Sequence, residues 1–139
     1  MTELLELYRI AEQDHIVVDC FDLRSRESLS LMDEAGDCYI AIDPFKLRSE
    51  QDEKEKLAHE LGHCETGSFY NQWAACDIRQ KHENRADKWA VRRLVPPDEL
   101  ARAVNDGYTE LWELAEQFGV SEEMIERAIC LYTWERLMA

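Results

Sequence analysis

Residues 59–63 read His59-Glu60-Leu61-Gly62-His63, and the fold must place this stretch on a helix if its two histidines are to act together. The pattern around it predicts one helix that begins near Ser49 and ends before Gly67. On a helix, side chains four residues apart lie one above the other, so these two imidazoles can bind a single metal ion. Glu60 lies beside the first imidazole and can reach a water molecule on that ion.

A second acidic segment supplies a candidate for the missing ligand. Residues 82–90 read His-Glu-Asn-Arg-Ala-Asp-Lys-Trp-Ala and belong to another predicted helix. A catalytic zinc ion takes three protein ligands and keeps one position open, and two His with one Glu are a standard set. We therefore predict a zinc site in which Glu83 joins His59 and His63.

Asp87 lies four residues after Glu83 and shares its helix face. We expect its carboxylate to accept a hydrogen bond from the far nitrogen of His59 or His63, which would fix the tautomer and orientation of that ring. His82 is the alternative third ligand, but it lacks an acidic partner four residues further on.

A pair of solvated surface histidines is the plain alternative to a metal site. The neighbouring Lys54, Glu55 and Lys56 are expected to lie in solvent. Glu60, Glu83 and Asp87, taken together, favour the metal site over this alternative.

Cys64 is turned about 100° away from the second imidazole and is expected to be a packed thiol. Zinc suits these donors best, although iron or manganese could occupy them in vitro.

The chemistry follows from the ion. Zinc lowers the pKa of its bound water to about 7 and polarises a substrate carbonyl. Glu60 would take the proton of that water as general base and pass it to the leaving amine, so that an amide bond is cleaved. A further donor should stabilise the oxyanion, and Tyr70 and His82 are both candidates for it.

The fold class is predicted to be α+β with a zincin-like arrangement. Short runs rich in β-branched and aromatic residues, with Leu29 and Leu31 alternating in the second, predict a small, mostly antiparallel three-stranded sheet. An active-site helix and a helical C-terminal region follow it. The expected strands cover residues 15–23, 27–32 and 38–42. The expected helices cover 3–12, from about 50 to Gly62 or beyond, 79–95, 98–105, 110–118 and 122 to the end, with a loop over 67–78.

The C-terminal region contains a pattern typical of a helix-turn-helix pair. Ala115, Gly119 and Ile125 match its small-residue, turn-glycine and buried-aliphatic spacing, while Thr109 and Ser121 are the expected N-caps of the two helices. We expect a metallopeptidase core over residues 1–97 and a helical subdomain over residues 98–139, joined in one compact unit at Pro96-Pro97.

Charge and composition restrict the partners. Thirty acids against sixteen bases give a net charge of -14, and from Asp98 onward ten acids face three bases, which argues against binding to nucleic acid. Five cysteines without a C-x-x-C pair argue against a disulfide framework. No apolar run is long enough to span a bilayer, and the start of the chain does not read as a signal peptide, so we expect a cytoplasmic protein.

The motif, the segment Glu83-x-x-Ala-Asp87, the upstream strand 38–42 and Leu94-Val95-Pro96 together resemble the ImmA/IrrE family of metallopeptidases over roughly residues 15–130. A broader likeness extends to thermolysin-like enzymes. The ImmA/IrrE resemblance implies a bacterial or phage protein that acts as an anti-repressor by cutting a helix-turn-helix transcriptional repressor. It also implies that the four motif residues carry the ligand and base roles assigned above.

The resemblance further implies a gene of prophage or mobile-element type, because no segment matches the sensory domain of the longer members. The leading hypothesis is therefore a zinc metalloendopeptidase that acts on a repressor protein. Two other classes stay open: a non-catalytic metal-containing module that binds proteins, and a DNA-binding regulator.

Overall fold

The structure, a computed structural model, describes residues 1–70 and 74–138 and confirms the α+β class. The chain forms two compact units, one of Glu3–Ala90 and one of Met1–Thr2 with Val91–Ala139. A subdomain boundary at residue 97, as expected from the sequence, stays a prediction. The elements are α1 (Leu4–Gln13), β1 (Val17–Cys20), β2 (Ser28–Met32), β3 (Cys38–Ile42), the 3-10 turn η1 (Pro44–Lys46), α2 (Glu50–Thr66), α3 (Cys76–Leu94), α4 (Pro97–Asn105), α5 (Leu111–Phe118) and α6 (Glu122–Met138).

The sheet of the Glu3–Ala90 unit is mixed rather than mostly antiparallel. Its strand order is β1-β3-β2, with β1 parallel to β3 and β2 antiparallel to it. The turn after β2 contains Gly36 in the left-handed region (φ 87) and returns the chain antiparallel onto β3. β1 lies on the opposite edge of β3, and the alternation of side chains along a strand does not determine its direction.

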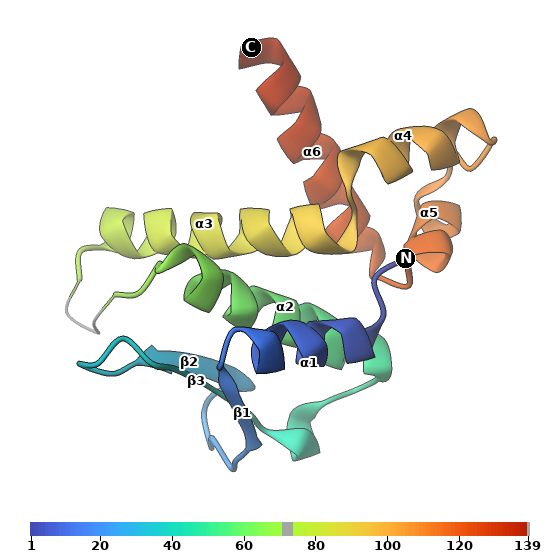
Figure 1. The fold of residues 1–139 in the computed structure, drawn as a ribbon. Helices are drawn as coiled ribbons and strands as arrows, with labels where there is room; N and C mark the ends of the chain where they lie inside the picture. Colours follow the sequence, from blue (N-terminus) through green and yellow to red (C-terminus); the bar gives the residue numbers. More distant parts are fainter. Residues whose placement is uncertain (71–73, 139) are drawn as a thin grey trace. The chain divides into compact units, whose positions relative to one another are not determined.

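One face of the sheet packs against α2, which lies between the sheet and the first part of α3 (Figure 1). Cys38, Ile40 and Ile42 of β3 are buried on this face. Their cross-strand partners on β2 are Met32, Ser30 and Ser28, so the edge strand presents two hydroxyl groups to the helix. Leu31 points to the other face and is 56% exposed.

Helix α2 begins and ends as the sequence predicts. The Ser49 hydroxyl accepts a hydrogen bond from the Asp52 backbone N–H at 3.1 Å, and Gly67 ends the helix in the left-handed region. The expectation that Lys54 lies in solvent is wrong, because this side chain is buried. The core of the unit consists of Leu7, Ala11, Cys38, Ile40, Ile42, Leu57, Ala58, Leu61, Ala86 and Ala90.

The two long helices of this unit touch at a glycine. A Cβ atom added to Gly62 would lie 2.4 Å from the Ala86 carbonyl oxygen and 2.9 Å from the Ala86 Cα. Such distances are far below van der Waals contact, so only glycine permits α2 and α3 to approach this closely. The contact brings the turn of α3 that carries Glu83 and Asp87 against the motif.

The second unit contains the expected helix pair α5 and α6. Gly119 ends α5 in the left-handed region (φ 63), and Ser121 caps α6 by accepting a hydrogen bond from the Met124 N–H at 3.1 Å. Thr109 is not the cap of α5: Glu110 occupies that position, and its N–H donates to Glu113 at 3.2 Å. The core of this unit consists of Val91, Leu94, Val95, Leu100, Leu114, Ala115, Phe118, Val120, Met124, Ile125 and Ala128.

Two further expectations concern the whole chain. All five cysteines carry free thiols, as expected. Within residues 1–70 and 74–138, no helix is long and apolar enough to cross a membrane.

Candidate metal centre

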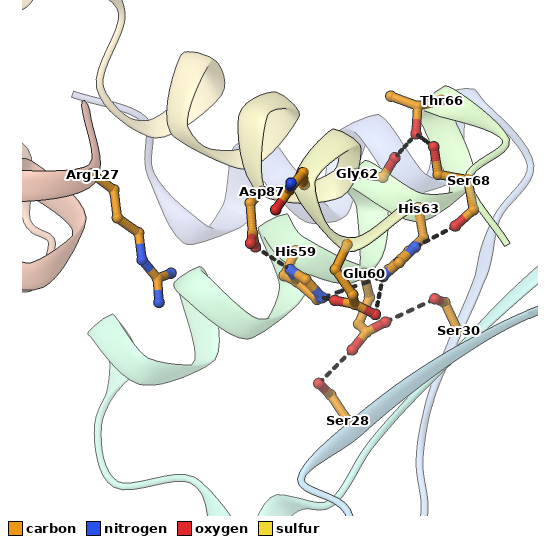
Figure 2. Close-up of polar contacts among 12 residues, drawn as sticks. Ser28, Ser30, His59, Glu60, Gly62, His63, Thr66, Ser68, Asp87 and Arg127 are labelled. Atoms are coloured by element: carbon orange, nitrogen blue, oxygen red, sulfur yellow. Dashed lines mark hydrogen bonds and ion pairs between the residues drawn. The ribbon is translucent and has the colours of Figure 1, made fainter. Parts of the chain in front are cut away.

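The two imidazoles of α2 are each fixed by a hydrogen bond at Nδ1 (Figure 2). His59 Nδ1 lies 2.8 Å from the Asp87 Oδ1, and His63 Nδ1 lies 2.5 Å from the Ser68 carbonyl oxygen. A carboxylate and a carbonyl only accept hydrogen bonds, so both rings must donate from Nδ1. Their Nε2 atoms are therefore left to bind something else, and they lie 3.2 Å apart.

Glu83 reaches both of these nitrogens from α3. Its two carboxylate oxygens lie 2.9 Å from His59 Nε2 and 3.3 Å from His63 Nε2. The Tyr70 hydroxyl donates a hydrogen bond of 2.7 Å to the same carboxylate, and this bond raises the pKa of Tyr70. The site thus brings together two imidazole nitrogens and one carboxylate, which are separated by one loop in the sequence.

This donor set fits a small metal cation. Two imidazole nitrogens and a carboxylate at these distances point lone pairs at one another, and such an arrangement requires a proton or a cation between them. With zinc–ligand bonds of 2.0–2.1 Å, the edges of a tetrahedron are roughly 3.3 Å long. The observed separations of 2.9, 3.2 and 3.3 Å are close to that value.

Glu60 stands beside these donors without joining them. Its two oxygens accept hydrogen bonds of 2.7 Å from Ser28 and Ser30 of β2 (Figure 2). The ligand atoms of Glu60 and of the two imidazoles lie within 4.8 Å of one another, a distance that one bridging water molecule can span. Glu60 is 6% exposed and so is held in a nearly closed environment.

The surrounding carboxylates give the site a negative potential. Burial alone would lower the pKa of His59, but the hydrogen bond to Asp87 and the nearby carboxylates raise it above its usual value. The same negative potential attracts metal cations, and a divalent ion gains about twice as much from it as a singly charged ion does.

His82 and Cys64, which adjoin the proposed ligands in the sequence, have other neighbours in the structure. The His82 ring stacks on Tyr70, with ring centroids 6.2 Å apart, and its buried Nδ1 has no hydrogen-bond partner within the described chain. Cys64 is half-buried against the Cys38 thiol, and burial raises its pKa. In the predicted loop, residues 71–73, including Trp73, lie outside the described residues, and α3 begins at Cys76 rather than at 79.

Sequence reasoning missed three partners of the site, namely Ser28, Ser30 and the Ser68 carbonyl oxygen. The serines could have been noticed, because they alternate with Leu29 and Leu31 and so share one face of a strand. The sequence did not predict that the serine side chains face the helix, because the alternating leucines suggested that the leucine face of the strand was the buried one. A backbone carbonyl leaves no signal in the sequence.

An α+β fold that carries His-Glu-Leu-Gly-His on one helix and a carboxylate ligand candidate on the next defines the metallopeptidase class. The chain belongs to the Peptidase_M78 family, because residues 25–129 match the model described as the IrrE N-terminal-like domain. This match confirms the resemblance seen in the sequence. A search of curated proteins gave no match.

Proposed function

We propose that this chain is a zinc endopeptidase that cleaves a protein. The observation that carries the proposal is the convergence of His59 Nε2, His63 Nε2 and Glu83 at separations near those of a tetrahedral ion, with Glu60 beside them. Glu83 is the better candidate for the third ligand, because its carboxylate oxygens lie 2.9 and 3.3 Å from the two Nε2 atoms, whereas Glu60 is held toward Ser28 and Ser30 of β2.

In the proposed mechanism each residue has a separate task. His59, His63 and Glu83 would hold the ion, and Asp87 would keep the His59 ring in the correct tautomer. When bound, zinc would activate a water molecule and polarise the scissile carbonyl. Glu60 would accept the proton of the attacking water at a carboxylate oxygen and deliver it to the leaving amine.

For the substrate we propose a helix-turn-helix repressor, so that the protein acts as an anti-repressor of phage or mobile-element type in the cytoplasm. Family membership supports this. The charge of -14 supports it as well, because a DNA-binding protein is basic and opposite charges accelerate association. The same charge disfavours DNA itself as a partner.

The decisive experiment is Glu60→Gln, combined with metal analysis. A candidate helix-turn-helix repressor would be incubated with the zinc-loaded protein, and fragments would be identified by mass spectrometry. We expect wild-type protein to cut the repressor, and Glu60→Gln to retain zinc and lose cutting by at least about 100-fold. Glu50→Gln, an exposed change on the same helix, is the matched control and should cut normally.

If Glu60→Gln protein cuts as fast as wild-type protein, the catalytic role is wrong. If neither cuts but both bind the repressor equally, the chain is the non-catalytic binding module considered above. A gel shift with DNA at low salt tests the remaining alternative, and tight, salt-sensitive binding would support a DNA-binding regulator.

A further inference from the structure

The carboxylate of Glu60 is held by a second structural element. Ser28 donates to Oε2 and Ser30 donates to Oε1, each at 2.7 Å (Figure 2). Both donors come from β2, whereas Glu60 comes from α2. Both oxygens of the Glu60 carboxylate are therefore hydrogen-bonded to one strand, β2, which carries none of the proposed metal ligands.

The two hydroxyls occupy positions where the fold otherwise uses apolar side chains. Ser28 and Ser30 face the helix side of the sheet, opposite the buried Ile42 and Ile40. A hydroxyl on such a face requires a hydrogen-bond partner, and a buried carboxylate requires donors. Here each group supplies what the other lacks, and Glu60 is the partner of both serines.

Two donors from one strand fix the carboxylate more tightly than one would. The serines are two residues apart, so their hydroxyls are separated by the fixed repeat of an extended strand. Binding one oxygen to each restrains rotation of the carboxylate about its last torsion, which is otherwise broad. An ionised carboxylate has about four acceptor positions, so each oxygen keeps capacity to take a proton.

We propose that Ser28 and Ser30 are positioning residues that hold Glu60 in the orientation needed for proton transfer. This inference rests on the proposed function, because it assigns a purpose to the orientation of the proposed base. The serines act through Glu60, to which both hydroxyls donate.

A binding measurement tests this without a substrate. The probe is acetohydroxamic acid, a small zinc chelator whose acidic proton can pass to a base beside the metal. Its affinity for the zinc-loaded protein would be measured by calorimetry, together with zinc content and thermal unfolding of each variant. We expect Ser28→Ala with Ser30→Ala to weaken the probe about tenfold, with zinc content unchanged.

The role of the serines is separated from simple structure by a double-mutant cycle with Glu60→Ala. If the serines act through Glu60, their removal in the Glu60→Ala background changes probe affinity less than about twofold. An equal loss in both backgrounds would overturn the inference, and so would no loss in the double serine variant.

Near-isosteric variants keep the test valid if alanine disturbs the strand. Ser28→Thr with Ser30→Thr keeps both hydroxyls, and Ser28→Val with Ser30→Val has nearly the same shape without them; both side chains favour strands. We expect the threonine pair to bind the probe like wild-type protein and the valine pair to match the alanine pair. Ser25→Ala, at an exposed loop serine, is the surface control.

The two proposals fail in different ways. If Glu60→Ala weakens the probe while the serine variants do not, only the positioning inference is wrong. If wild-type protein does not retain zinc, or if Glu60→Ala binds the probe as tightly as wild-type protein, the proposed function is wrong and the positioning inference with it.

Discussion

The hydrogen bond between His59 and Asp87 joins the motif helix to the next one. Asp87 comes from α3 and meets the imidazole nitrogen that faces away from Glu83. A ring held in this way presents Nε2 in one tautomer and one orientation, so a metal meets a preformed ligand. The effect of Asp87 on the site should therefore be large even though it does not face the ligand atoms.

Asp87→Asn should weaken zinc binding by about 10- to 100-fold, because an amide can present a donor to His59 and permit the wrong tautomer. Competition with a fluorescent chelator would measure the change. Asp77→Asn, an exposed change in the first turn of the same helix, should leave zinc affinity as it is. Equal affinities for Asp87→Asn and wild-type protein would contradict this role.

Glu65 of α2 and Asp14, which follows α1, form a pair of interacting carboxyl groups outside the candidate metal centre. Burial and the neighbouring Asp14 carboxylate raise the pKa of Glu65 from 4.5 to about 7. Between these two values the folded chain keeps a proton that the unfolded chain releases, so stability falls as the pH rises through this window.

Asp14→Asn should reduce this slope without abolishing it, because the burial of Glu65 remains. Because both side chains remain largely in contact with solvent, which screens their interaction, we expect a gain in the free energy of unfolding of only about 0.5 kcal/mol at pH 8, and almost none at pH 4.5. Urea unfolding at pH 4.5, 6 and 8 would measure it. Glu12→Gln, at an exposed carboxyl of α1, is the control; identical slopes in Asp14→Asn and wild-type protein would show that the pair does not interact.

Helix α2 depends on Gly62 for its distance from α3. The added Cβ would lie 2.4 Å from a backbone carbonyl oxygen, which cannot move aside as a flexible side chain could. The two helices must therefore separate when any side chain is placed there. Since Glu83 and Asp87 belong to α3 and the imidazoles to α2, separation would disturb both the ligand set and the Asp87 hydrogen bond.

Gly62→Ala should cost about 1–3 kcal/mol in the free energy of unfolding and should also lower zinc affinity. Gly36→Ala is an informative comparison, because this glycine has positive φ and nothing within 4 Å of an added Cβ. Its strain should cost about 1–2 kcal/mol while zinc affinity is preserved. Urea unfolding and zinc titration of both variants check this; normal zinc binding by Gly62→Ala would show that the helices tolerate separation.

Zinc binding should also be visible in the stability of the complete protein. A ligand that binds only the folded state at 100 times its dissociation constant adds about 2.7 kcal/mol to the free energy of unfolding. We expect the unfolding temperature to rise with added zinc and to fall again with a chelator. Glu60→Gln should show the same rise, whereas His59→Ala with His63→Ala should show none; a rise in that variant would place the zinc elsewhere.

The sequence predicted most reliably those features that depend on residue types with few structural roles, such as histidine pairs and helix-capping residues. Two histidines one helical turn apart, with acids at suitable spacing, led to a cluster that the fold brings together, and Ser49 and Gly67 marked the ends of its helix. These signals are local, because caps and helical spacing depend on neighbours in the chain.

The remaining features depend on contacts between distant segments. The parallel pairing of β1 with β3 joins segments about 20 residues apart in the sequence, and the burial of Lys54 follows from neighbouring elements rather than from its own charge. Ser28 and Ser30 read as ordinary polar residues of an exposed strand until α2 places Glu60 against them. Thr109 is a good capping residue, but the chain begins the helix one residue later.

The metal-binding pattern is usually written with two unspecified letters between its first acid and its last histidine. In this protein both letters are constrained: Leu61 has no exposed surface, and Gly62 abuts the backbone of the facing helix. In a saturation library of the five positions, these two should tolerate about as few replacements as the ligands do. Their losses would arise from misfolding or misalignment, so a screen that records only activity would miscount them as chemical residues.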